Sequence, residues 1–175
     1  MRSAVPVALA AAFALAVATT VVDATVDATC KSAAAGDSRV NLQLCLSQLG
    51  HHRESPDADT WGLAKVASLV GVNSADLAAD DIKTMEASHP SPALAQCAKL
   101  YAGVGLAFAS AQDEINKRAY AAGKQRLAEA ISLTKQCDVA FANAKAAVPQ
   151  PLAQRNADSV QIAIIATAIT NLIKQ

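Results

Sequence analysis

The sequence lacks the short motifs that mark common active sites. It contains no G-x-S-x-G elbow, no glycine-rich phosphate loop and no H-E-x-x-H pair. Its two adjacent acidic pairs, Asp80-Asp81 and Asp113-Glu114, do not provide convergent carboxylates, because neighbouring side chains on a helix point about 100° apart. These absences predict a protein that is not an enzyme.

Metal-ligand spacing is missing as well. The four cysteines form no C-x-x-C pair, and His51, His52 and His89 do not lie at ligand spacing from any cysteine. We therefore expect no metal and no cofactor. The 15 basic and 15 acidic residues balance, so net charge offers no basis for binding nucleic acid or an anionic membrane.

Aromatic residues are scarce, at 3% of the chain, whereas alanine is abundant. Valine, isoleucine and threonine do not gather into alternating runs, so strands are not indicated. The composition favours helices that pack closely through small side chains, and hence an all-α protein.

An apolar segment opens the chain. Arg2 precedes a run of alanine, valine, leucine and phenylalanine, and small residues at cleavage spacing end at Ala18 and again at Ala24. This pattern predicts a signal peptide over residues 1–24, cleaved after Ala18 or Ala24. A transmembrane anchor is the alternative, but it needs about 20 apolar residues. We expect a secreted protein of the apoplast or cell wall, with the vacuole as the other destination and no membrane contact after cleavage.

The four cysteines follow this segment, at Cys30, Cys45, Cys97 and Cys137. An even number in a secreted chain predicts two disulfides. Four cysteines allow three pairings, and their number alone does not choose among them.

Four periodic segments predict a four-helix bundle. They span about residues 59–88, 92–115 and 120–141, and a last segment that begins near Asn156 as N-cap. Gly71 and Asn73 weaken the first segment and allow a kink. The expected buried positions are Leu63, Val66, Val70, Leu77, Ile82 and Met85; Leu94, Cys97, Tyr101, Val104, Phe108, Ala111 and Ile115; Tyr120, Gly123, Leu127, Ala130, Thr134, Cys137 and Phe141; and Ile162, Ile165, Ile169 and Leu172, with Ile164 and Ile173 beside them.

The second and third segments carry Cys97 and Cys137 on their inward stripes. Consecutive helices with a short connection are antiparallel neighbours, so the stripes favour the pair Cys97–Cys137. That leaves Cys30 with Cys45 around a polar turn at residues 36–38. The sequence thus predicts an up-and-down four-helix bundle over residues 57–175, preceded by an N-terminal hairpin and linker over residues 25–56.

Five stretches in this order resemble the plant invertase and pectin methylesterase inhibitors. Residues 29–49 resemble the family's two-cysteine hairpin, and residues 61–85 its first bundle helix. The third-cysteine helix, residues 93–115, has Cys97 followed four residues later by Tyr101, and residues 119–141 and 155–173 resemble the last two helices. The resemblance implies that the hairpin is helical and that the first cysteine pairs with the second and the third with the fourth.

The same resemblance implies an inhibitor that covers the active-site cleft of a plant carbohydrate enzyme. Residues 64–83 and the long polar second linker resemble those of the invertase-inhibitor-like members. We therefore expect the target to be a cell-wall or vacuolar acid invertase (beta-fructofuranosidase). Pectin methylesterase is the alternative target. A secreted helical bundle without any enzyme target is a further hypothesis.

Invertase inhibitors of the family carry a Pro-Lys-Phe element between the third- and fourth-cysteine helices. Here the corresponding residues are Asn116-Lys117-Arg118-Ala119-Tyr120, which keep a base and an aromatic ring but neither the proline nor the phenylalanine. The resemblance makes Lys117, Arg118 and Tyr120 candidates for partner binding. Alternatively, Tyr120 belongs to the core and the two basic side chains are only solvated.

Overall fold

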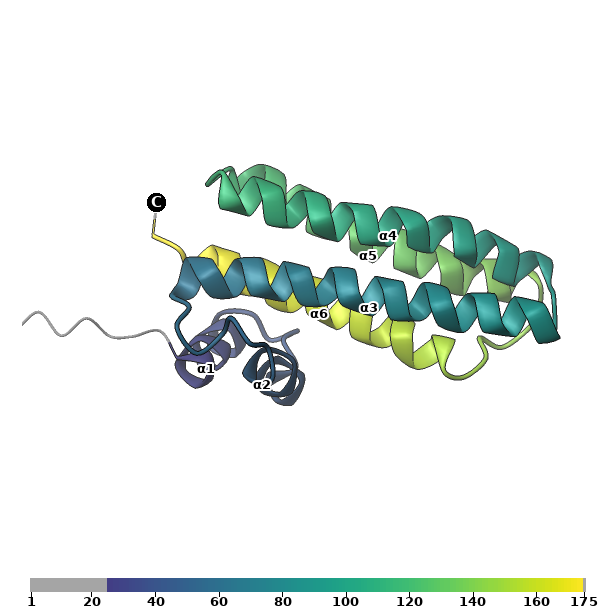
Figure 1. The fold of residues 1–175 in the computed structure, drawn as a ribbon, viewed down its shortest axis with the longest axis horizontal. Coiled ribbons are helices and arrows are strands. Elements are labelled where there is room, and N and C mark those ends of the chain that lie inside the picture. The colour runs from purple at the N-terminus through teal and green to yellow at the C-terminus, as the bar shows by residue number, and fades with distance from the viewer. Residues whose placement is uncertain (1–24, 175) are drawn as a thin grey trace, which may run out of the picture.

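A computed structural model describes residues 25–174 and contains six helices among them (Figure 1). They are α1 (Val26–Gly36), α2 (Leu42–Gly50), α3 (Thr60–Ser88), α4 (Pro92–Asn116), α5 (Tyr120–Asn143) and α6 (Leu152–Leu172). No strand occurs within residues 25–174, so the all-α fold class is confirmed. The predicted signal peptide, residues 1–24, lies outside the described residues.

The four long helices form an up-and-down bundle. In Figure 1, α3 runs away from the hairpin, α4 returns, α5 runs away again and α6 returns to the end at which α1 lies. Helix α4 packs against α3 and α5, and α6 packs against α3 and α5, which closes the ring of four. The α4–α5 connection therefore lies at the same end as the start of α3 and the end of α6.

The two short helices form a hairpin beside this bundle. Cys30 and Cys45 join α1 to α2, with their Cα atoms 5.8 Å apart. Helix α1 packs against α6 and α2 against α3. The backbone N–H of Asn41 also donates to Oε1 of Gln161 on α6 at 3.1 Å, so the hairpin is attached along both of its helices.

Local sequence accounts for most helix starts. Thr25, Asn41, Asp59 and Ser91 each accept a hydrogen bond from a backbone N–H in the first turn of the helix that follows. Pro92 then stands in the first turn of α4, where its missing N–H costs nothing. The predicted start of the second bundle segment at Ser91 and Pro92 is correct.

The inward stripes of α4 and α5 are buried at every predicted position. In α3 the prediction failed at Leu77, which is 50% exposed. Ala75 and Ala78 take the buried positions there, because a close-packed α3–α4 contact admits small side chains and leaves Leu77 on the outer face.

Gly71 does not interrupt α3, which continues as one helix from Thr60 to Ser88. The ring of Phe108 lies so close that a Cβ added to Gly71 would overlap its Cδ1 atom. The glycine therefore makes room for an aromatic ring between α3 and α4, and the predicted weak point is a packing position.

The start of α6 also differs from the expectation. The helix begins at Leu152, directly after Pro151, and Asn156 lies inside it with 2% exposure. Helix α5 ends at Asn143, ahead of both prolines of the connection. Proline is well tolerated just before or within the first turn, so here it begins a helix, and Asn156 is not an N-cap.

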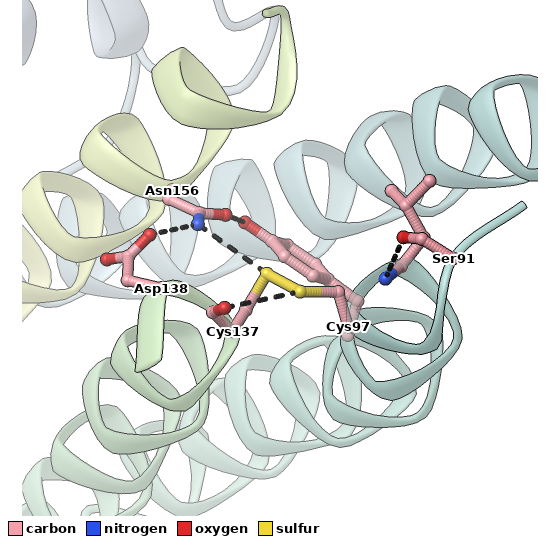
Figure 2. The surroundings of a disulfide bond; sticks show 7 residues. Ser91, Cys97, Cys137, Asp138 and Asn156 are labelled. Atoms are coloured by element: carbon pink, nitrogen blue, oxygen red, sulfur yellow. Dashed lines mark hydrogen bonds between the residues drawn. A yellow bond between two sulfur atoms is a disulfide. The ribbon is translucent and has the colours of Figure 1, made fainter. Parts of the chain in front are cut away.

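Asn156 instead joins three helices around the second disulfide (Figure 2). Cys97 and Cys137 link α4 to α5, with their Cα atoms 4.8 Å apart. The Asn156 amide donates to Asp138 and contacts Sγ of Cys137 at 3.6 Å, and its oxygen accepts from the Tyr101 hydroxyl at 2.6 Å. Burial raises the pKa of Tyr101 to about 12. The two disulfides are the pairs that the inward stripes favour.

Candidate functional site

The α4–α5 connection is short and projects at the hairpin end of the bundle. It consists of Lys117, Arg118 and Ala119 between Asn116 and Tyr120. Lys117 closes α4, and its ammonium group lies 3.3 Å from a carboxylate oxygen of Glu114. Arg118 has a φ of 62°, a left-handed backbone conformation that is uncommon outside glycine.

The predicted site residues do not form one surface. Lys117 and Arg118 are exposed, whereas Tyr120 is only 7% exposed. Its side chain belongs to the inward stripe of α5, and its hydroxyl lies 3.4 Å from Nη1 of Arg118. The connection therefore presents two basic groups without presenting the tyrosine ring.

Trp61 supplies the aromatic surface that Tyr120 does not. Its indole N–H donates to the backbone oxygen of Ile115 at 2.9 Å, which fixes the ring against the end of α4. Nζ of Lys65 lies 3.6 Å from the ring centroid, and the guanidinium carbon of Arg118 lies 4.9 Å from it. Both distances are within the range of a cation–π interaction. We call Trp61, Lys65 and Arg118 the cation–aromatic cluster.

Sequence reasoning missed this cluster because its members are 57 positions apart, from Trp61 to Arg118. A signal was present, since Trp61 is the single tryptophan of the chain and lies at the start of a predicted helix. Only the antiparallel course of α3 and α4 brings that start to the end of α4. The cluster offers a fixed aromatic ring with cations, which suits contact with an acidic partner surface.

A second surface feature is the outer face of α4. Leu106 is 69% exposed, more than any other large hydrophobic side chain in residues 25–174. Ala102 and Ala109, one turn away from it, are small, whereas Gly103 and Gly105 lie toward Leu133 of α5 and Ala75 of α3. Such a face is smooth enough for close approach by another protein, and an exposed leucine at its centre is a suitable anchor.

Two other kinds of site are absent from residues 25–174. No group of three or more histidine, cysteine, aspartate or glutamate side chains within residues 25–174 is placed to hold a metal ion. No helix in the same part of the chain is long and apolar enough to cross a membrane.

Comparison with known proteins gives consistent matches. The family model described as plant invertase/pectin methylesterase inhibitor matches residues 24–169. Pectinesterase inhibitor 12 of Oryza sativa subsp. japonica is 62% identical over 148 residues, which are 82% of this chain and 71% of that protein. Pectinesterase inhibitor 8 of the same plant is 54% identical over 149 residues, 83% of this chain and 81% of that protein.

A solved structure supports the fold independently. The crystal structure of mutant form A of a pectin methylesterase inhibitor from Arabidopsis matches with a TM-score of 0.69, covering 86% of this chain and 97% of that one. Its 15% sequence identity means that this match speaks to the fold alone. The family model and the two rice relatives, taken with the hairpin, the bundle and the two disulfides, show that the chain belongs to the plant invertase/pectin methylesterase inhibitor family.

Proposed function

We propose that this protein inhibits a pectin methylesterase. The observation that carries the proposal is the identity of more than half to two rice proteins that are both named pectinesterase inhibitors. The matched length of 148 to 149 residues is long enough to include both the hairpin and the bundle. The expectation of an invertase as the main target is less well supported than its alternative.

The burial of Tyr120 weakens the invertase contact that the family resemblance implies. An invertase contact built from a base and an aromatic ring requires both to be accessible, and Tyr120 is 7% exposed. The outer face of α4 around Leu106 presents an exposed leucine between the small side chains of Ala102 and Ala109. It suits a partner with an extended groove, since small residues let a helix lie flat against another surface.

An inhibition assay tests the proposal. The oxidised protein is titrated into a pectin methylesterase and, separately, into an acid invertase at mildly acidic pH. We expect a stoichiometric fall in esterase activity and no fall in invertase activity. If micromolar protein leaves the esterase rate unchanged, the proposal is wrong.

Leu106→Asp tests whether the outer face of α4 contacts the esterase. The substitution puts a charge on an exposed site, so the thermal midpoint should stay within a few degrees while esterase inhibition weakens at least tenfold. Val139→Asp on α5 is the matched control, because Val139 is also exposed, at 52%. Equal inhibition by the two variants would remove α4 from the interface.

Invertase inhibition is the second candidate function, and the cation–aromatic cluster favours it. Of the predicted partner-binding residues Lys117, Arg118 and Tyr120, the first two are exposed, and Trp61 provides the aromatic contact in place of the buried Tyr120. A variant with Lys117→Ala and Arg118→Ala leaves the buried Tyr120 in place and so separates contact from folding. If the wild type inhibits invertase and this variant does so equally well, the connection is not the binding element.

We further propose that the protein is secreted to the cell wall and has no catalytic activity of its own. Members of the family are enzyme inhibitors, and the predicted leader ends where the family match begins, at residue 24. The division into a signal peptide (1–24), a hairpin with linker (25–56) and a bundle (57–175) belongs to the same proposal. Amino-terminal sequencing of secreted protein locates the cleavage.

A further inference from the structure

We propose that the cleft between α2 and the bundle binds a single sugar unit, either free or at the end of a glycan. The cleft has a volume of about 240 Å³ and lies where the end of α2 faces α3 and α6. Junctions between separately packed units are common places for ligand sites. This inference stands apart from the choice of target enzyme, because no residue of the cation–aromatic cluster and no residue of the Leu106 face lines the cleft.

The walls of the cleft are fixed in position. Helix α2 is tied to α1 by Cys30–Cys45 and packs against α3, while α1 packs against α6. The hydrogen bond from Asn41 to Gln161 holds the start of α2 to α6. A cleft whose sides are fixed before binding spends little binding energy on ordering them.

Polar side chains from all three helices converge on this space. Gln48 comes from α2, Asn73 and Ser74 from α3, and Asp158 from α6. The two amides and the hydroxyl each donate and accept hydrogen bonds, and a carboxylate accepts them. Sugar hydroxyl groups also donate and accept, so this mixture matches a polyhydroxyl ligand better than a simple ion.

Two neighbouring histidines add one acceptor and one donor to the lining. Nδ1 of His51 lies 2.6 Å from the Ser47 carbonyl oxygen, which can only accept, so Nδ1 holds the proton and Nε2 is an acceptor. Nδ1 of His52 accepts from the Glu54 N–H at 3.3 Å, so the proton of the neutral ring is on Nε2. Both rings line the cleft.

Three apolar side chains line the cleft on the bundle side. They are Val70 and Leu77 of α3 and Ile162 of α6. Leu77 is half-exposed because it lies outside the α3–α4 core. An apolar side chain of this kind can pack against the C–H face of a pyranose ring.

Arg155 gives the cleft a means of binding an acidic sugar. Its Nε donates to Asp81 at 2.8 Å, and a guanidinium has five N–H donors in all, so other donors remain for a sugar carboxylate. Asp158 also lines the cleft and disfavours a second negative charge. The geometry thus accommodates one uronate carboxylate or a neutral sugar. The experiment compares the two kinds of sugar directly.

A titration followed by two-dimensional ¹H–¹⁵N NMR tests the site. The probes are D-galacturonate, D-galactose and sucrose, added separately to the full oxidised protein at slightly alkaline pH, which favours the neutral form of an imidazole ring. We expect saturable shifts for at least one sugar, with a dissociation constant on the order of millimolar. The shifts should cluster at residues 48–52, 73–77 and 155–158, and a response to galacturonate alone would assign the carboxylate to Arg155.

Two matched glutamine variants decide whether the cleft is responsible. Gln48→Leu removes a lining amide and should weaken binding about two- to tenfold, as expected for one lost hydrogen bond. Gln43→Leu changes an exposed glutamine of the same helix outside the cleft and should bind as the wild type does. Equal binding by both variants, shifts scattered over the surface, or no saturable shift with any of the three sugars would overturn the inference. None of these NMR results depends on enzyme inhibition, so a failure of the sugar site can be told apart from a failure of the proposed esterase inhibition.

Discussion

The N-terminal hairpin and the four-helix bundle each contain one buried disulfide, but the bonds have different surroundings. Helices α1 and α2 have 11 and 9 residues, lengths at which isolated helices are marginal in water. The bundle helices have 21 to 29 residues and pack against one another along their length. We infer that Cys30–Cys45 makes a small unit possible, whereas Cys97–Cys137 reinforces an extensive core.

The largest expected effect comes from the bundle disulfide. Replacing Cys97 and Cys137 with alanine opens a loop of 40 residues, which costs about 4 kcal/mol of unfolding free energy in the chain-entropy model. Both sulfurs are buried beside Asn156, so the loss should lower the stability of the whole chain. Urea unfolding followed by circular dichroism measures it, and an unchanged midpoint would mean that helix packing alone sets bundle stability.

The hairpin disulfide should have a smaller and local effect. Its loop spans 15 residues, which corresponds to about 3 kcal/mol in the same model. In a variant with Cys30→Ala and Cys45→Ala, hydrogen exchange should accelerate in α1 and α2 and stay slow in α3 to α6. Uniformly faster exchange would show that the hairpin and the bundle unfold together, which would contradict a separate, local role for Cys30–Cys45.

Glycine substitutions compare packing in the two regions directly. Gly71→Ala places a Cβ against the Phe108 ring and should cost about 1–3 kcal/mol through overpacking. Gly36 in α1 has open space where a Cβ would stand, with no atom within 4 Å, so Gly36→Ala should be neutral or slightly stabilising. Thermal midpoints of the two variants check this, and a second bundle position, Gly105→Ala with its nearest atom at 3.6 Å, should also be tolerated.

The polar contact beside the bundle disulfide gives a pH-dependent test. The folded-state pKa of Tyr101, about 12, lies above its ordinary value of 10.0 because the side chain is buried. Its contribution to stability is therefore complete below pH 10 and is lost as the pH rises from 10 to 12. Tyr101→Phe should lose about 1 kcal/mol at neutral pH with the bond to Asn156. It should also flatten the alkaline fall in stability, and an unaltered fall would contradict this role.

The smallest expected effect lies in the hairpin turn. Hydrogen bonds from the side chain and backbone of Arg39 lower the pKa of Asp37 from 3.8 to about 2. The stability this gives is present above pH 3.8 and is lost as the pH falls through 2. Arg39→Ala should raise the Asp37 pKa toward 3.8 and leave bundle stability unchanged, since the pair is near the surface. Carboxyl NMR titration measures the shift, and an unmoved pKa would rule out the pair as its cause.

Much of the fold was predictable because helical periodicity survives in a single sequence. Every predicted inward position of α4 and α5 is buried, and the two cysteines on those stripes pair as antiparallel packing requires. Predictions failed where the same residue type is compatible with two different structural roles. Gly71 fits a kink or a close contact, and Asn156 fits a cap or a buried amide, and the choice depends on what stands opposite.

The candidate site was less predictable than the fold, because its contacts come from residues that are distant in the sequence. Lys117 and Arg118 were identified from the family pattern and are exposed, but the tyrosine grouped with them is buried. Trp61, which contacts Arg118, is 57 positions earlier in the chain. A local motif contains no information about a partner supplied by another helix.

The sequence by itself determined the four bundle helices, the inward faces of α4 and α5 and the pair Cys97–Cys137, because these follow from local periodicity and short connections. Only the tertiary structure decided which ring accompanies Arg118, why α3 needs a glycine opposite Phe108, and that a cleft lies between α2 and the bundle. These features depend on side chains from distant segments meeting at fixed distances. Such meetings are set by the packing of whole helices and not by any one of them.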